Sequence, residues 1–154
     1  MKLYELPALE PEVTALAGEG VICRRAESYE RKHVIPFVRE RWPEWVDEAS
    51  AAFARVPSTL YFATEGGRVV GFAAYNVARP NFFGPTGVDE SQRKRGIGKA
   101  LLLQCLHALA AEGYAYAIIG GVGPAEFYAR SVGATLIPGS DPGIYGSMLD
   151  VAHG

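Results

Sequence analysis

The spacing of apolar and polar residues in the first third of the chain predicts one strand followed by two helices. Residues 20–26 (GVICRRA) have the length and composition of a short strand, and apolar residues recur at helical spacing in 42–56. A further helix is expected over 29–41, capped by Ser28 without a capping box, since a basic residue stands where an acid would be needed. Pro36 lies inside that segment and should kink or divide it.

The period then changes to two, which predicts strands. Residues 58–64 and 68–77 read as a β-hairpin closed by the turn Glu65-Gly66-Gly67, and residues 80–89 form a third strand. Strands joined by such short connections pair antiparallel. The middle of the chain is therefore predicted to be an antiparallel meander.

The last third alternates helix and strand. Residues 97–113 are apolar around most of a helix and end at a glycine, while 114–121 is an apolar run typical of a central strand. A short helix is expected over 124–133, and two short strands over 134–151 around a Gly/Pro loop. The predicted order is β-α-α-β-β-β-α-β-α-β-β. It indicates one α+β domain over 1–154, with a mixed, mostly antiparallel central sheet flanked by helices.

Composition narrows the function classes. The chain has 154 residues, 49% of them hydrophobic and 21% charged, with a net charge of −2. This balance argues against bulk affinity for nucleic acid or for a membrane surface. Cys23 and Cys105 lie in apolar settings and are expected to be buried thiols; a disulfide is the alternative. The N-terminus lacks the apolar core of a signal peptide, so a cytoplasmic location is expected.

One local feature opposes the acidic balance. The stretch QRKRGIGKAL, residues 92–101, places four cations around two glycines at the start of an apolar helix. Free N–H groups and the helix dipole favour an anion there, and glycines let phosphate oxygens approach the backbone. Ala100 excludes a Walker loop and Leu101 a dinucleotide fingerprint. The alternatives are a pyrophosphate site and a solvated basic loop.

The arrangement resembles the acetyl-CoA signature of the GNAT superfamily of N-acetyltransferases. A strand ending in Val88 is followed by four residues, then Arg-x-x-Gly-x-Gly and a long apolar helix. Residues 66–75 (GGRVVGFAAY) resemble the family's central hairpin strand, and residues 125–134 (AEFYARSVGA) its second motif. Two positions depart from the pattern: Gly121 stands where many relatives carry Asn, and Ala134 where they carry Phe. The motif-bearing core covers about residues 20–150.

The resemblance implies roles for individual residues. Backbone groups would bind the co-substrate, acetyl-CoA or coenzyme A, along the strand end and the loop: Gly87, Val88, Asp89, Arg93, Lys94, Arg95, Gly96, Ile97, Gly98 and Lys99. The N–H of Val88 would polarise the acetyl carbonyl. Tyr128 would act as the general acid for the departing thiolate, or else orient the sulfur; the alternative is an ordinary packing residue. No metal is implied.

The acceptor and the base are less defined. Asp89 and Glu126 lie near the motifs but are expected to face solvent, and His33 is expected to be structural or at the surface, so no base is assigned. The acceptor is expected between the helices of 29–56 and the loop 138–146. The first carries Trp42, Trp45 and Phe53 among Glu40, Glu44, Asp47 and Glu48. This is either an aromatic and acidic lining for a cationic amine or an amphipathic helix with its acids outward.

The resemblance implies acetyl transfer from acetyl-CoA to a primary amine of a small molecule or peptide, by direct attack in a ternary complex. A non-catalytic acyl-CoA-binding or sensing module of the same fold is the alternative, and nucleic-acid binding through the four cations is a weaker one. Since the family often dimerises through its late strands, a homodimer is a further expectation.

Overall fold

Five strands form a mixed sheet whose order follows the sequence, β1-β2-β3-β4-β5. In the computed structural model, which describes residues 1–149, neighbouring strands from β1 to β4 pair antiparallel and β5 pairs parallel to β4. The strands are β1 (Val21–Arg25), β2 (Leu60–Glu65), β3 (Arg68–Tyr75), β4 (Phe82–Val88) and β5 (Ile118–Ile119). The predicted hairpin, third strand and α+β class are confirmed.

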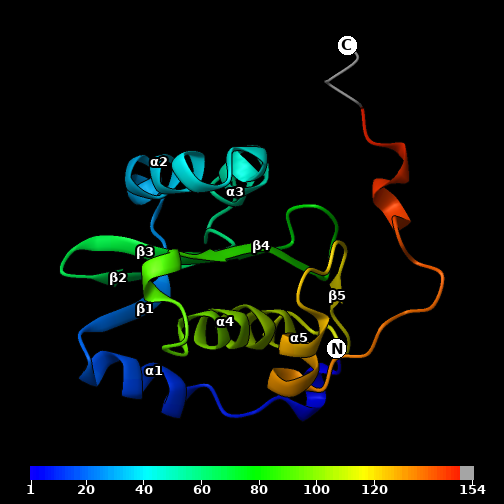
Figure 1. Cartoon of the computed structure of the whole chain (residues 1–154), viewed down its shortest axis with the longest axis horizontal. Coiled ribbons are helices and arrows are strands. Elements are labelled where there is room, and N and C mark those ends of the chain that lie inside the picture. The colour runs from blue at the N-terminus through cyan, green and yellow to red at the C-terminus, as the bar shows by residue number, and fades with distance from the viewer. Residues whose placement is uncertain (150–154) are drawn as a thin grey trace.

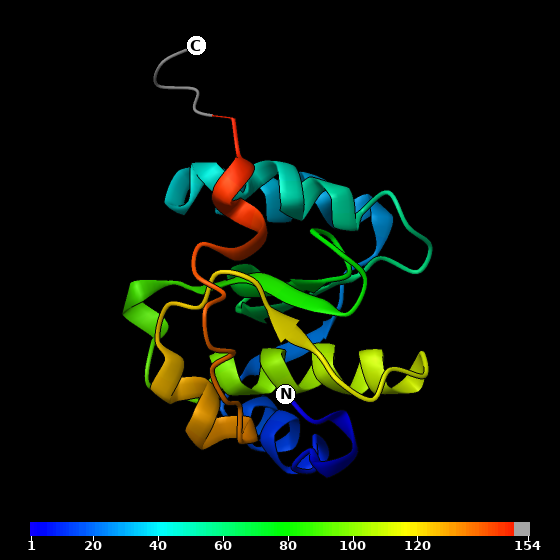
Figure 2. The ribbon, with the colours of Figure 1, turned by 90° about the vertical axis from the view of Figure 1, so that its right-hand side faces the viewer.

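Helices cover both faces of this sheet (Figures 1 and 2). One layer holds α2 and α3; the other holds α1, α4 and α5. Their bounds are α1 (Glu10–Gly18), α2 (Arg31–Arg41), α3 (Val46–Ala52), α4 (Ile97–Ala111) and α5 (Ala125–Val132). Short 3₁₀ turns precede, connect or follow these helices, at Leu3–Glu5, Ser28–Glu30, Pro43–Trp45, Glu90–Gln92 and Gly143–Ser147.

The alternation along β2 and β3 divides the core between the two helical layers. Phe62 and Phe72 belong to the cluster under α2 and α3, whereas Ala63 and Ala73 belong to the cluster around α4. Successive side chains of a strand point to opposite faces, so alternate residues of β2 and β3 pack against the helices on the two sides of the sheet.

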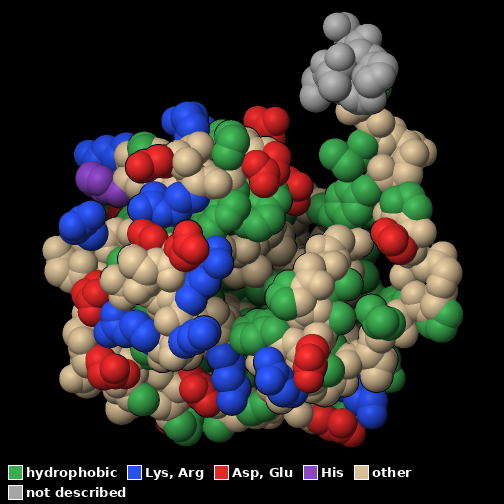
Figure 3. Space-filling model, viewed as in Figure 1, with side chains coloured by type: hydrophobic (Ala, Val, Ile, Leu, Met, Phe, Trp, Pro, Cys, Tyr) green, Lys and Arg blue, Asp and Glu red, His purple; other side chains and the backbone are tan. Residues whose placement is uncertain are grey.

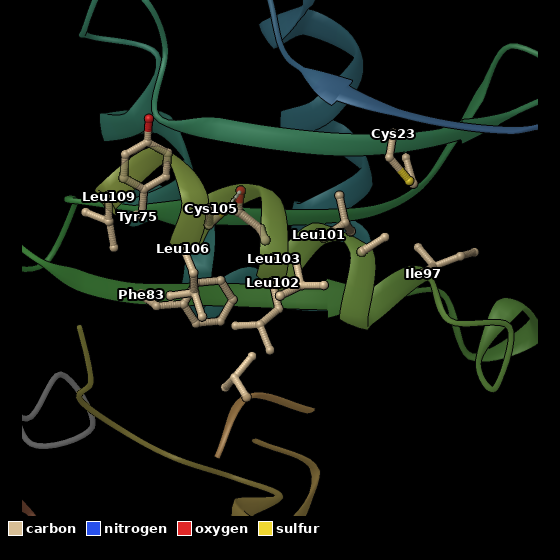
Figure 4. Packing of buried hydrophobic residues seen from close by; sticks show 14 of the residues in the cluster. Cys23, Tyr75, Phe83, Ile97, Leu101, Leu102, Leu103, Cys105, Leu106 and Leu109 are labelled. Carbon is tan, nitrogen blue, oxygen red and sulfur yellow. Dashed lines mark hydrogen bonds between the residues drawn. The ribbon is translucent and has the colours of Figure 1, made fainter. Parts of the chain in front are cut away.

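Helix α4 is the centre of the larger cluster (Figure 4). Every residue from Ala100 to Leu106 is buried, as are Ile97 and Leu109. The predicted helix, apolar around most of its circumference, is therefore confirmed. Its burial holds the N-terminal end of α4, with the loop before it, in a fixed position beside β4.

The N-terminal half differs from the prediction in three places. Helix α1 was not expected, although Pro11 in its first turn and an apolar stripe ending at the buried Leu16 are helix signals. Pro36 lies inside α2 without dividing it, on the exposed side of the helix. The expected cap at Ser28 is also wrong: a 3₁₀ turn begins there, and the carboxylate of Glu30 accepts the N–H of Glu27 at 2.8 Å.

The C-terminal part differs more. The predicted central strand over 114–121 is reduced to Ile118–Ile119 at the edge of the sheet. Neither strand expected in 134–151 forms within 134–149, and the end of that range lies outside the described residues. Pro138 and Pro142, each followed by a glycine, explain this, because proline offers no N–H to a ladder and glycine weakens a strand.

Two smaller expectations have a clear outcome. Cys23 and Cys105 are both buried and free, as predicted. Burial raises the pKa of the Cys23 thiol to about 11 and raises the pKa of the Cys105 thiol as well. Within residues 1–149, no helix is long and apolar enough to cross a membrane.

Candidate active site

The loop between β4 and α4 presents a row of free backbone N–H groups. Its backbone turns sharply, with positive φ at Lys94 and Gly96. The first bond into α4 runs from the N–H of Ala100 to the carbonyl of Gly96, at 3.1 Å. Among the described residues, no N–H from 94 to 99 donates to a protein acceptor. The loop and the first turn of α4 therefore offer an anion site built from backbone.

The four cations of the loop are not equivalent. Arg95 forms an ion pair with Glu65 of β2 at 3.0 Å, and Lys99 one with Glu12 of α1 at 3.2 Å. Arg93 donates from Nε to the carbonyl of Val88 at 3.3 Å and lies exposed, as Lys94 does. Arg95 and Lys99 thus hold the loop against neighbouring elements. Arg93 and Lys94 form no ion pair with a carboxylate in the described part of the chain.

Strand β4 has an open edge beside this loop. Its pairing with β5 consists of Phe82 and Phe83 against Ile118 and Ile119, while β4 continues to Val88. The two strands therefore diverge along the second half of β4. Figure 1 shows β5 turned away from the line of β4.

The register with β3 fixes which groups face that open edge. The N–H of Asp89 bonds to the carbonyl of Val70 at 2.8 Å, and Gly71 lies opposite Val88. In an antiparallel ladder, hydrogen-bonded and non-bonded pairs alternate. The N–H of Val88 thus points away from β3 into the open edge, as the N–H of Thr86 does. The N–H groups of Gly87 and Asp89 face β3 instead.

Two glycines place the neighbouring elements close to this edge. A Cβ built on Gly98 would lie 3.8 Å from both Val88 and Phe127, so the start of α4, the end of β4 and α5 meet there. A Cβ on Gly87 would lie 2.5 Å from the ring of Trp42, which stacks on Trp45 with centroids 5.4 Å apart. Gly87 is therefore needed for packing against α2, on the face of β4 opposite α4.

Tyr128 lies beside the open edge, on α5. Its ring contacts Phe83 and Phe127 edge-on, with centroids 6.2 and 5.0 Å away. Burial raises the pKa of Tyr128 to about 12. The hydroxyl is therefore protonated at neutral pH. No described residue forms a hydrogen bond with it, so it is available to a ligand.

Two cavities meet at Tyr128. The larger, about 1030 Å³, lies along β5, α5 and the segment 134–144. The smaller, about 400 Å³, lies between α3, β4 and the C-terminal turn. Figure 3 shows this face hollowed between the α2–α3 layer and α5, with apolar side chains in the hollow. The smaller cavity lies between the segments 29–56 and 138–146, where the acceptor is expected, and Trp45 and Tyr145 both line it.

The carboxylates near the site fall into two groups. Asp89 forms an ion pair with Arg41 at 2.8 Å, and that guanidinium holds the pKa of its carboxyl below the usual range. Glu126 is exposed, as expected. Glu44 and Glu48, in contrast, line the smaller cavity, and burial raises the pKa of Glu48.

Sequence reasoning therefore found the acids of 42–56 without finding which of them face the cavity. Their i, i+4 spacing signals a shared helix face. The distant partners Gly120 and Tyr145 complete that wall: a Cβ on Gly120 would lie 2.8 Å from the Tyr145 hydroxyl. His33 is exposed on α2 and is not among the residues lining either cavity.

Comparisons with known proteins point to one family and one fold. Residues 24–133 match the model of the acetyltransferase (GNAT) family. No curated protein matches the chain.

Solved structures share the fold at low identity. A glucosamine N-acetyltransferase region of a fungal multi-domain β-N-acetylglucosaminidase superposes with a TM-score of 0.69 at 17% identity, over 85% of this chain and 18% of that one. This chain thus spans less than a fifth of that protein. A GNAT acetyltransferase from Brucella melitensis, solved with acetyl-CoA, gives 0.55 at 19% identity, over 71% and 80% of the two chains. An aminoglycoside acetyltransferase from an uncultured soil sample, solved with sisomicin, gives 0.52 at 11% identity, over 73% and 84%.

Proposed function

Because the chain belongs to the GNAT family of acetyltransferases, we propose that it transfers an acetyl group from acetyl-CoA to a primary amine of a small molecule or peptide. The observation that carries the proposal is the open edge of β4: it leads from the free N–H groups of the loop to the hydroxyl of Tyr128. The acetyl thioester supplies the acyl group. The residues of the chain bind the thioester, polarise its carbonyl group and stabilise the leaving sulfur.

The loop 93–99 fits a pyrophosphate. Its free N–H groups and the positive end of the α4 dipole favour an anion, and Gly98 leaves room for one to approach the backbone. Arg93 and Lys94 add charge at the exposed side of the loop, whereas Arg95 and Lys99 hold its shape through their ion pairs. The proposed binding contacts are therefore mainly backbone contacts, with two assisting side chains.

The open edge of β4 suits the extended arm of the co-substrate, which can pair with it as an added strand does. Only the N–H groups that point away from β3 can take part, so Val88 and Thr86 are the proposed donors. Gly87 and Asp89 contribute shape rather than N–H groups. A donor such as the Val88 N–H, placed where charge develops on the acetyl oxygen, is worth about 2.7–4 kcal/mol in enzymes where such a donor was removed.

Tyr128 acts on the leaving sulfur. A thiol has an ordinary pKa of about 8.5, and the pKa of Tyr128 is about 12. The thiolate forms in the same buried site, where desolvation raises its pKa as well, so the phenol is the protonated partner at neutral pH. We therefore assign Tyr128 the role of hydrogen-bond donor to the developing thiolate, with the final proton coming from solvent.

Direct attack by the amine is favoured over an acyl-enzyme. Cys23 and Cys105 are buried with raised pKa values, so neither is a nucleophile at neutral pH. Two free thiols also suit the expected reducing cytoplasm. The homodimer expected from the resemblance stays a prediction. The late strands through which it was expected to form are absent from residues 134–149.

The first test is a thermal shift with acetyl-CoA, coenzyme A, ATP and NAD on wild type and Gly98→Glu. A ligand at 100 times its dissociation constant stabilises the folded protein by about 2.7 kcal/mol. We expect only the coenzyme A compounds to raise the melting temperature. In Gly98→Glu the ligand-induced rise should vanish, because a carboxylate occupies and repels the pyrophosphate position.

The substitution should not harm folding. A Cβ at Gly98 would meet Val88 and Phe127 at 3.8 Å, an ordinary van der Waals contact, and an acid at a helix N-terminus stabilises the helix by about 0.3–1 kcal/mol. The matched control is Ala111→Glu, which adds the same charge at the exposed far end of α4. It should keep the ligand-induced rise. Equal stabilisation by ATP, or an undiminished rise in Gly98→Glu, would overturn the proposed loop site.

A further inference from the structure

The smaller cavity beside Tyr128 has one distinctive wall. Glu44 and Glu48 of the α3 region lie there with Trp45, opposite the backbone of β4 and beside Tyr145 of the C-terminal turn. The same cavity reaches Tyr128, which the proposed function places at the leaving sulfur. A group held by this wall therefore lies within the space where the acetyl carbon must be attacked.

Among the described carboxylates near the site, Glu48 combines partial burial with the absence of a hydrogen-bond or ion-pair partner, whereas Glu44 is exposed. Asp89 is paired with Arg41, and the exposed Glu126 lines only the larger cavity. Within the described residues, Glu48 forms no hydrogen bond or ion pair, although it is half-buried. Its charge acts on the Tyr145 phenol, whose pKa it helps to raise. A half-buried carboxylate without a cation in the protein is well placed to bind one from outside.

The aromatic rings around Glu48 suit the same guest. Trp45 and Tyr145 line the cavity from two different elements, and their faces attract a cation within about 6 Å. No lysine or arginine lines this cavity among the described residues, so its wall carries only negative charge.

We propose that Glu48 binds the ammonium group of a small cationic amine in this cavity and takes up, one after the other, the two protons that its nitrogen loses during acetyl transfer. This inference rests on the proposed function and assigns the acceptor class and the base that the sequence left open. A volume of about 400 Å³ lies in the range of small-molecule pockets and favours a small amine over an amine carried by a protein.

The step balances without any further reactant. The nitrogen forms a bond to the acetyl carbon, and the carbon–sulfur bond breaks with its electron pair leaving on sulfur. The bound ammonium first gives one proton to the carboxylate of Glu48, which passes it to solvent, and the nitrogen gives up a second proton by the same route as the amide forms. The released thiolate takes one proton back from solvent. Tyr128 donates a hydrogen bond to the departing thiolate, and the product amide is neutral, so it no longer binds the acidic wall.

The experiment compares wild type, Glu48→Gln and Asp47→Asn in acetylation of butylamine, 1,4-diaminobutane, phenethylamine and tryptamine, followed by mass spectrometry. Glu48→Gln keeps the size of the side chain and removes the charge. Asp47→Asn is the matched control, since Asp47 is exposed on the same helix and does not line the cavity. We expect kcat/KM at pH 7 to fall about 10²–10⁴-fold in Glu48→Gln, the usual effect of losing a general base, and to stay unchanged in Asp47→Asn.

A pH profile separates a base from a structural role. The other titratable groups that line the cavity are Glu44, on the same wall as Glu48, and Tyr128 and Tyr145, and both phenols have raised pKa values. An amine with pKa about 10.4 is largely protonated at pH 7 and much less so at pH 9.5. The deficit of Glu48→Gln should therefore shrink at least tenfold between these two pH values. A merely structural defect would be constant over the same range.

The outcomes distinguish this inference from the proposed function. If wild type binds acetyl-CoA but acetylates no amine, the proposed function fails and the inference with it. If wild type is active and Glu48→Gln matches it at pH 7, or shows a deficit independent of pH, only the assignment of Glu48 is overturned. Butyltrimethylammonium, which cannot be acetylated, should inhibit wild type competitively and Glu48→Gln at least tenfold more weakly.

Discussion

Replacing Tyr128 by Phe removes one hydroxyl from the point where the two cavities meet. The ring keeps its contacts with Phe83 and Phe127, and the hydroxyl has no hydrogen-bond partner among the described residues. The hydroxyl reaches the cavities rather than being sealed in the core, so removing it leaves no buried group unpaired. The substitution should therefore leave the free energy of unfolding nearly unchanged, and a loss of rate at unchanged stability reports on catalysis.

The size of that loss follows from the pKa of Tyr128. A phenol with a pKa of about 12 donates a hydrogen bond to a thiolate without transferring its proton. Hydrogen bonds to charged groups are worth about 1.5–3 kcal/mol, which corresponds to a loss in kcat of about 10- to 150-fold at 1.4 kcal/mol per factor of ten. A full general acid would cost about 10²–10⁴-fold.

Steady-state kinetics with acetyl-CoA and a saturating amine measure this directly. Since the phenol stays protonated up to its pKa, kcat should show no fall attributable to Tyr128 between pH 7 and pH 10. A kcat unchanged by Tyr128→Phe would remove the tyrosine from the mechanism, and a drop in melting temperature of several degrees would assign it to packing instead.

Two further substitutions test how the site is supported. Gly87→Ala should destabilise the protein by about 1–3 kcal/mol in chemical denaturation, because its Cβ would meet the ring of Trp42 at 2.5 Å and force that ring to move; an unchanged midpoint would show that Trp42 is not closely packed there. Asp89→Asn should lower the free energy of unfolding at pH 7 by at most about 1 kcal/mol, through loss of the ion pair with Arg41. Since Arg41 depresses the pKa of Asp89, that difference should fade as pH falls through the carboxyl range, and a difference that persists at pH 2 would contradict the account.

The sequence was most informative where local chemistry determines structure. The loop 93–99 could be placed at the mouth of a helix from its glycines and from the apolar run after it, and the structure has α4 beginning at Ile97. The sequence could not show, however, which cations of that loop form ion pairs, because Arg95 and Lys99 pair with Glu65 and Glu12 from distant elements.

Properties that depend on pairing between strands were beyond sequence reasoning. Gly87, Val88 and Asp89 are consecutive, and only the register with β3 shows that the N–H of Val88 faces the open edge while that of Asp89 does not. The late strands were wrong for a related reason: an apolar run such as residues 134–137 becomes a strand only if a partner is in reach. The same dependence hid Glu48, whose cavity is closed by residues far along the chain.

The most direct test of the central claim is the amine-dependent release of coenzyme A by wild-type protein. Acetyl-CoA is incubated with and without the four amines, the free thiol is titrated, and the acetylated amine is quantified by mass spectrometry. We predict thiol release that requires an amine and matches the acetylated product one to one. Stabilisation by coenzyme A without amine-dependent thiol release would contradict the account and identify the chain as an acyl-CoA-binding module.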